Sequence, residues 1–178
     1  MTARATSKAG AASAAGGATG SQRLSLKGRA LRLLSQREHS RAELERKLAA
    51  HEQQPGELAA ALDALQVKGF ISEERVAESV LHRRAARFGA ARIRHELKAK
   101  GLPDGVVAQA VAQLRGTELE RGQQVWRAKF AQAPQDAKER ARQARFLAAR
   151  GFGGEVIARV LRGGFEAQDT DAGPDAGT

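Results

Sequence analysis

The sequence predicts an all-α protein, an elongated array of three tandem three-helix repeats with disordered N- and C-terminal tails. Apolar residues recur at helical spacing in short segments that end at glycine or proline. The pattern of these segments returns about every 50 residues, which is typical of helical units stacked in a row. Aromatic residues make up only 4% of the chain, so Leu, Val, Ile and Ala must build the core.

The clearest copy of the repeat lies between Ser72 and Leu114. Ser72 is a suitable N-cap for a first helix, Gly101 a suitable end for a second, and Pro103 a suitable start for a third. Moving back 49 residues from Ile93, Leu97, Val107, Val111 and Leu114 gives Leu44, Leu48, Leu58, Leu62 and Leu65. Moving forward 50 residues from Leu97, Val107 and Val111 gives Leu147, Ile157 and Leu161. These constant offsets predict that each unit covers the apolar face of its neighbour.

The repeat divides the chain into five segments. Residues 1–23 form an Ala-, Gly- and Ser-rich tail, and residues 163–178 an acidic tail; both are expected to be disordered. Between the tails lie repeat 1 (24–71), repeat 2 (72–115) and repeat 3 (116–162).

Local signals predict how the units begin and join. Ser40 with Glu43, and Thr117 with Glu120, have the spacing of capping boxes that open helices. Phe70 and Ile71 follow a glycine that ends a helix, and we expect this apolar pair to pack across the junction into repeat 2.

Composition excludes several classes of protein. The chain has no cysteine, which excludes a disulfide framework, thiolate catalysis and cysteine-ligated zinc, and suits a reducing compartment. No apolar run approaches the roughly 20 residues that span a bilayer, and the first residues lack the hydrophobic segment of a secretory signal. We therefore expect a cytoplasmic protein without a membrane partner.

The formal net charge is +10 and is unevenly distributed. The first 23 residues hold three basic residues and no acid, whereas the last 13 hold four acids and no base. The basic excess therefore belongs to the folded middle of the chain. Such an excess favours an anionic partner, either nucleic acid or a protein coated on it.

Catalytic motifs are missing from the sequence. It has no phosphate-binding loop and no serine-nucleophile motif, and its histidines (His39, His51, His82 and His95) lack metal-binding spacing. We expect these histidines to lie on the surface. The glutamates sit beside Lys or Arg and suit helix caps and solvated faces. We therefore expect no enzymatic activity, no metal and no cofactor.

A basic cluster is the strongest candidate for a functional site. Its members in repeat 2 are Arg83, Arg84, Arg87, Arg92, Arg94, Lys98 and Lys100, with Glu96 as the one acid among them. Repeat 3 adds Lys138, Arg142 and Arg145. Arginine's planar fork suits phosphate or carboxylate recognition. We find no interleaved aromatic residues for base stacking, which makes base-specific recognition of single strands weak.

Four segments, in this order, resemble the RecX family of recombination regulators. They read ALRLLSQREHSRAELERKL (30–48), GFISEERVAES (69–79), RIRHELKAKGL (92–102) and RFLAARGF (145–152). The resemblance covers residues 24–162. It departs at Ser72 and Val76, where the family tends to have an acid and an aromatic residue, which leaves the packing detail of that helix open.

The resemblance implies three tandem three-helix repeats and a regulatory protein without enzymatic activity or cofactor. Its implied partners are the RecA protein and the RecA filament on single-stranded DNA, with DNA itself as a further partner. The implied effect is to modulate, and most often inhibit, RecA ATPase, strand exchange and coprotease activity. The family has no fixed contact motif, so the ten basic residues named above are a physical hypothesis for the filament- or DNA-binding surface. We expect a monomer.

Two other functions remain open. The second and third helices of each repeat could form helix-turn-helix units that bind duplex DNA without RecA. Against this, the third helices carry mostly Ala, Val, Gln and Leu, while the charge lies on the second helices. A pure protein–protein scaffold is the other alternative, and it predicts little dependence of binding on salt.

Overall fold

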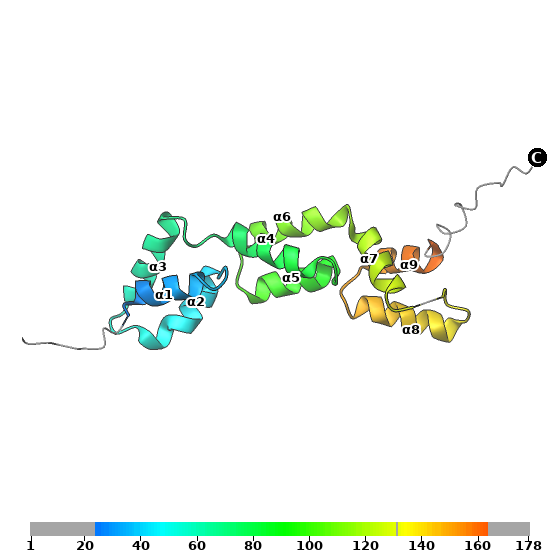
Figure 1. The fold of residues 1–178 in the computed structure, drawn as a ribbon, viewed down its shortest axis with the longest axis horizontal. Coiled ribbons are helices and arrows are strands. Elements are labelled where there is room, and N and C mark those ends of the chain that lie inside the picture. The colour runs from blue at the N-terminus through cyan, green and yellow to red at the C-terminus, as the bar shows by residue number, and fades with distance from the viewer. Residues whose placement is uncertain (1–23, 131, 164–178) are drawn as a thin grey trace, which may run out of the picture.

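The protein forms a row of three helical modules (Figure 1). The structure is a computed structural model and describes residues 24–130 and 132–163. Within these ranges there are nine α-helices, one 3₁₀ turn and no strand, which confirms the predicted all-α array. The two predicted tails lie outside the described residues, apart from Gly163 at the end of the last helix.

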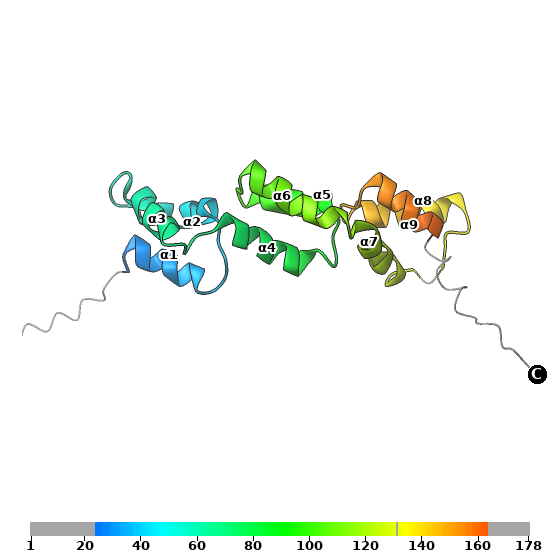
Figure 2. The same ribbon diagram turned by 90° about the horizontal axis from the view of Figure 1, so that it is seen from above.

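Each module contains three helices. Module 1 holds α1 (Leu26–Leu34), α2 (Arg41–Leu48), the 3₁₀ turn η1 (Ala49–His51) and α3 (Glu57–Val67). Module 2 holds α4 (Glu73–Arg84), α5 (Ala90–Ala99) and α6 (Asp104–Arg115). Module 3 holds α7 (Glu118–Arg127), α8 (Ala137–Ala148) and α9 (Gly154–Gly163). The two orthogonal views show the modules in sequence order along one axis (Figure 2).

Each module has its own apolar core, so the prediction that each unit covers the apolar face of its neighbour is wrong. The residues offset by 49 and 50 occupy the same place in the three cores: Leu48, Leu97 and Leu147 are all buried, in three separate clusters. The third helices of the three modules are likewise held by Leu58, Val107 and Ile157. The predicted repeat is therefore a repeat of packing as well as of sequence.

The apolar pair after α3 does not behave as predicted. Ile71 is buried in the core of module 1, and Phe70 is 48% exposed. The Phe70 amide donates to the Leu65 carbonyl and closes the end of α3, with Gly69 at a φ of 74°. This turn directs Ile71 back onto its own module instead of across the junction.

One predicted capping box is confirmed and the other is wrong. Ser40 and Glu43 exchange bonds at the start of α2, with the Glu43 amide 3.1 Å from the Ser40 hydroxyl. At the start of α7, Thr117 makes no capping bond. Its hydroxyl instead accepts from the Arg121 guanidinium at 3.2 Å, and its backbone (φ −112°, ψ 5°) is not in the extended conformation of a typical N-cap.

The modules join through their second helices. The start of α2 meets the end of α5, where the Ser40 hydroxyl donates to the Lys100 carbonyl. The start of α5 meets the end of α8 in the same way, because the Gly89 amide donates to the Arg150 carbonyl at 2.9 Å. Ser40 and Gly89 are 49 residues apart and precede equivalent helices. Consequently α2, α5 and α8 form one row along the molecule (Figures 1 and 2).

A glutamate completes each junction. Glu73, the first residue of α4, accepts from the Arg41 amide at 3.0 Å. Glu118, the first residue of α7, accepts from the Ala90 amide at 2.9 Å. The first amides of a helix have no acceptor within that helix, and the positive helix end favours an anion. The first helix of one module therefore caps the second helix of the module before it.

The contact between modules 2 and 3 requires a glycine at position 89. A Cβ placed on Gly89 would lie 2.3 Å from the Gly151 carbonyl oxygen, which belongs to the backbone of module 3. Gly89 has an ordinary φ of −77°, so the requirement comes from the close approach of the two chains and not from backbone strain.

We predict that Gly89→Ala opens the junction between modules 2 and 3. The new methyl group cannot fit without displacing backbone, which should lower the free energy of unfolding by about 1–3 kcal/mol. Urea unfolding measures this loss, and small-angle X-ray scattering measures the change in the distribution of shapes.

The matched control is Gly105→Ala in α6, where a Cβ meets nothing within 4 Å. We expect this variant to unfold like the parent or slightly later. A Gly89→Ala variant with parental stability and scattering would contradict the close contact.

Candidate functional site

Most of the predicted basic residues lie on the surface of modules 2 and 3. The exposed ones are Arg83, Arg84, Arg87, Arg92, Arg94, Lys98, Lys138, Arg142 and Arg145. Arg84 pairs with Glu96 at 3.4 Å, and Lys98 pairs with Asp104 at 3.0 Å. The other seven form no ion pair with a carboxylate of residues 24–130 or 132–163, so their charges are available to a partner.

Lys100 has a different place from the rest of the cluster. Its ammonium group bonds the Glu43 carboxylate at 3.0 Å, and its carbonyl accepts from Ser40. Both bonds run from module 2 to module 1, and its side chain is only 17% exposed. The geometry thus gives Lys100 a part in the junction.

Glu43 is the centre of a buried polar cluster at this junction. Its carboxylate also accepts from the Arg37 guanidinium at 3.0 Å and from the Ser40 amide at 3.2 Å. Burial is the largest single influence and opposes ionisation of this carboxyl. The bonds from Arg37, Lys100 and Ser40 together outweigh burial and lower the pKa of Glu43 to about 2.

His39 belongs to the same cluster, which corrects the expectation that it lies on the surface. It is 1% exposed, and its Nδ1 is 3.9 Å from a Glu43 carboxylate oxygen. Burial, followed by the neighbouring Arg37 charge, lowers the pKa of His39 below its ordinary value. His39 directly precedes Ser40, the N-cap of α2, and so lies at the helix end where module 2 docks.

Arg121 is a junction residue that sequence reasoning did not find. This arginine of α7 is 9% exposed and donates to the carbonyls of Ala85 (2.7 Å), Phe88 (2.9 Å) and Leu114 (3.0 Å). Ala85 and Phe88 follow the end of α4, and Leu114 lies in the last turn of α6. The C-terminal end of a helix is a favourable place for a cation. Burial lowers the pKa of Arg121. Nothing in the local sequence separates it from the exposed arginines.

Aromatic rings are interleaved with the cations, contrary to the sequence-based expectation. The rings of Phe130 and Phe146 meet edge to face, with their centroids 5.1 Å apart. Arg142 lies over Phe130 at 5.8 Å, and Arg150 lies over Phe146 at 3.6 Å. Arg142 and Phe146 are four residues apart on α8, and Arg150 follows four residues later, just past the end of that helix. This spacing could have indicated one stacked face. The contribution of Phe130 depends on the fold.

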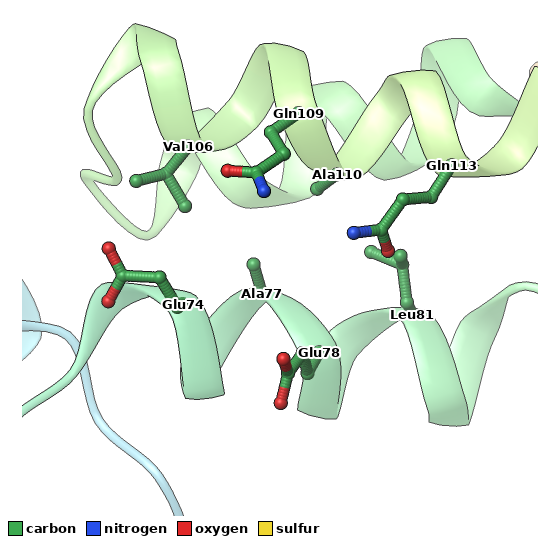
Figure 3. A pocket seen from close by; sticks show the side chains of 8 residues that line it. All are labelled: Glu74, Ala77, Glu78, Leu81, Val106, Gln109, Ala110 and Gln113. Carbon is green, nitrogen blue, oxygen red and sulfur yellow. The ribbon is translucent and has the colours of Figure 1, made fainter.

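The seam between α4 and α6 contrasts with this basic surface (Figure 3). It encloses a hollow of only about 40 Å³, with Ala77 and Ala110 facing each other across it. Glu74 and Glu78 lie on the α4 side of this seam. Two carboxylates make it unsuited to an anion, and its volume leaves space for water only.

The structure as described offers neither a metal site nor a membrane span. Among residues 24–130 and 132–163, no group of three or more His, Asp or Glu side chains is placed to hold a metal ion. No helix in these ranges is long and apolar enough to cross a membrane.

The fold defines a protein built of three tandem three-helix repeats. Family models confirm this repeat by repeat. Residues 27–65 match the first three-helix domain of RecX, residues 72–111 the second, and residues 117–161 the third. The chain belongs to the RecX family of regulatory proteins.

Curated relatives and solved structures agree with this assignment. The chain is 58% identical over 139 residues to the regulatory protein RecX of Leptothrix cholodnii, covering 78% of this chain and 88% of that one. It is 49% identical over 142 residues to the RecX of Ralstonia nicotianae, covering 80% and 89%. The crystal structure of RecX from Lactobacillus salivarius has the same fold, with a TM-score of 0.68, 20% identity, and coverage of 77% and 92%.

We predict that Glu43 makes the stability of the protein depend on pH. Its pKa is lowered from 4.5 to about 2, so its stabilisation is complete above pH 4.5 and is lost as the pH falls toward 2. The full effect corresponds to about 3 kcal/mol. Urea unfolding of the parent and of Glu43→Gln, at about pH 7 and about pH 3, measures it.

The difference in the free energy of unfolding between the parent and Glu43→Gln separates the contribution of Glu43 from that of the other acids. Glu73, whose pKa is raised by burial, titrates in the opposite sense and is present in both. We expect the parent's advantage to shrink markedly at the lower pH. An advantage of equal size at both pH values would contradict the predicted role.

Proposed function

We propose that the protein binds RecA and the RecA filament on single-stranded DNA, and that it inhibits RecA ATPase, strand exchange and coprotease activity without any catalysis of its own. Membership of the RecX family supports a regulatory role connected with RecA. The observation that carries the proposal further is the row of three docked modules, which presents unpaired cations along modules 2 and 3.

The shape of the molecule suits a long, regular partner. Docking through α2, α5 and α8 fixes the spacing between modules, so charges on different modules are held at set separations. A partner with a regular arrangement of anionic groups can then engage several modules at once, which raises the overall affinity above that of any single contact. A nucleoprotein filament has such an arrangement.

The chemistry of the exposed groups suits phosphates and carboxylates. Arg83 lies in the last turn of α4 and Arg87 in the turn that follows it, whereas Arg92 and Arg94 lie on α5. Their guanidinium groups can bind an oxyanion with two parallel bonds. Contacts with phosphates would make binding fall steeply with salt.

The third helix of module 2, α6, is poorly suited to read duplex DNA. The exposed positions of α6 are occupied mainly by Ala108, Gln109, Ala112 and Gln113, with Arg115 at its last residue. A helix that enters the major groove needs base-contacting side chains near its start and cations along the phosphates. The surface therefore favours the filament over a sequence-specific duplex site.

We predict that replacing Arg83, Arg87 and Arg94 with Ala weakens inhibition of RecA ATPase on single-stranded DNA. Each exposed charge contact contributes about 0.2–1 kcal/mol, so half-inhibition should require about tenfold more protein. The parent should inhibit at amounts well below those of RecA, because it would act on filament ends or growth.

The control removes three exposed cations elsewhere, with Arg32, Lys68 and Arg159 replaced by Ala. It has the same net charge as the test variant and should inhibit like the parent. Equal inhibition by the test variant and the parent would show that Arg83, Arg87 and Arg94 do not contribute to binding the filament. Inhibition by the parent only near saturation of the DNA would point to simple competition for phosphates and contradict the filament mechanism.

A further inference from the structure

A notch of about 340 Å³ lies where the end of α4 faces α7 and α8. Apolar and basic side chains line it, among them Arg87, Val125, Ala128, Lys129, Phe146 and Arg150. No carboxylate is part of this lining. The notch therefore combines apolar side chains with three cations from two modules, and no carboxylate in its lining neutralises them.

The two exposed cations of the notch are free to bind an anion. The Arg87 guanidinium and the Lys129 ammonium form no ion pair with the described residues. Arg87 comes from module 2 and Lys129 from module 3. An anion held by both would bridge the junction that Gly89 and Arg150 make through their backbones.

Arg150 and Phe146 form a platform that is ordered in advance. The Arg150 guanidinium lies over the Phe146 ring at 3.6 Å and donates to the Phe146 carbonyl at 3.2 Å. Phe130 supports the same ring from its edge. A planar group that enters the notch can therefore stack on the guanidinium without first ordering a flexible side chain.

We propose that this notch holds one nucleotide of a single strand, with the phosphates on Arg87 and Lys129 and the base on the Arg150–Phe146 platform. A single strand leaves the faces of its bases free to stack on aromatic or guanidinium planes, whereas a duplex covers them. Cations beside a stacking platform are the combination that such strands require. The proposal rests on the proposed function and specifies where the DNA of the filament would be contacted.

The test measures binding of a labelled oligothymidylate of about 20 nucleotides by fluorescence anisotropy, over a range of salt and without RecA. An abasic oligonucleotide of the same length provides the phosphates without the bases. The full chain is used throughout, and its helicity and melting are checked for each variant.

Two variants separate the phosphate contacts from the stacking contact. Arg87→Ala with Lys129→Ala should weaken binding and reduce the salt slope by about 1.4, since each phosphate contact on a single strand contributes about 0.7. Arg150→Lys keeps the charge and loses the planar group. This variant should keep the salt slope of the parent. Its affinity for the normal oligonucleotide, relative to the abasic one, should fall about tenfold.

The control, Arg115→Ala with Arg159→Ala, removes two exposed cations that lie outside the notch and should bind like the parent. The proposal is overturned if the parent does not bind the oligonucleotide, or if the notch variants match it in affinity, slope and preference. It is also overturned if Arg87→Ala with Lys129→Ala loses inhibition of RecA while binding the oligonucleotide normally, because the notch would then contact protein. Normal oligonucleotide binding through the notch without any effect on RecA would instead contradict the proposed function alone.

Discussion

The array depends on one repeated interaction, the docking of the first turn of each second helix onto the end of the second helix in the next module. A helix start presents amides without acceptors and a helix end presents carbonyls without donors, so joining the two satisfies both. Between modules 2 and 3 the donor is the Gly89 amide, which bonds the Arg150 carbonyl. Between modules 1 and 2 the hydroxyl of the N-cap Ser40 takes this place and bonds the Lys100 carbonyl. Glutamates at the starts of α4 and α7 reinforce them.

This docking links stability with binding. Arg150 lines the proposed nucleotide notch, and its carbonyl also accepts from the Gly89 amide and holds modules 2 and 3 together. The proposed nucleotide notch spans modules 2 and 3, so its cations stay in register only while that junction is closed. We infer that bound nucleic acid would stabilise the junction, since a ligand that binds the closed arrangement favours it.

The sequence predicted what local pattern determines and missed what the junctions determine. Apolar spacing and glycine stops indicated the helices, and constant offsets indicated the repeat. His39 was misplaced because it lies in the polar cluster around Glu43, which Lys100 of module 2 joins from about 60 residues further along the chain. Thr117 resembled an N-cap, but its hydroxyl bonds Arg121, which anchors module 3 on module 2. Such partners are fixed by the three-dimensional arrangement and have no local signature.

Hydrogen exchange of individual amides tests the docking most directly. The amides of Gly89, Ala90 and Ala91 donate across the junction, whereas those of Asp104, Gly105 and Val106 begin α6 without an acceptor among the described residues. We predict that the three junction amides are protected nearly as well as the interior of α5. Exchange as fast as in the first turn of α6 would contradict a closed array and show that the modules move independently.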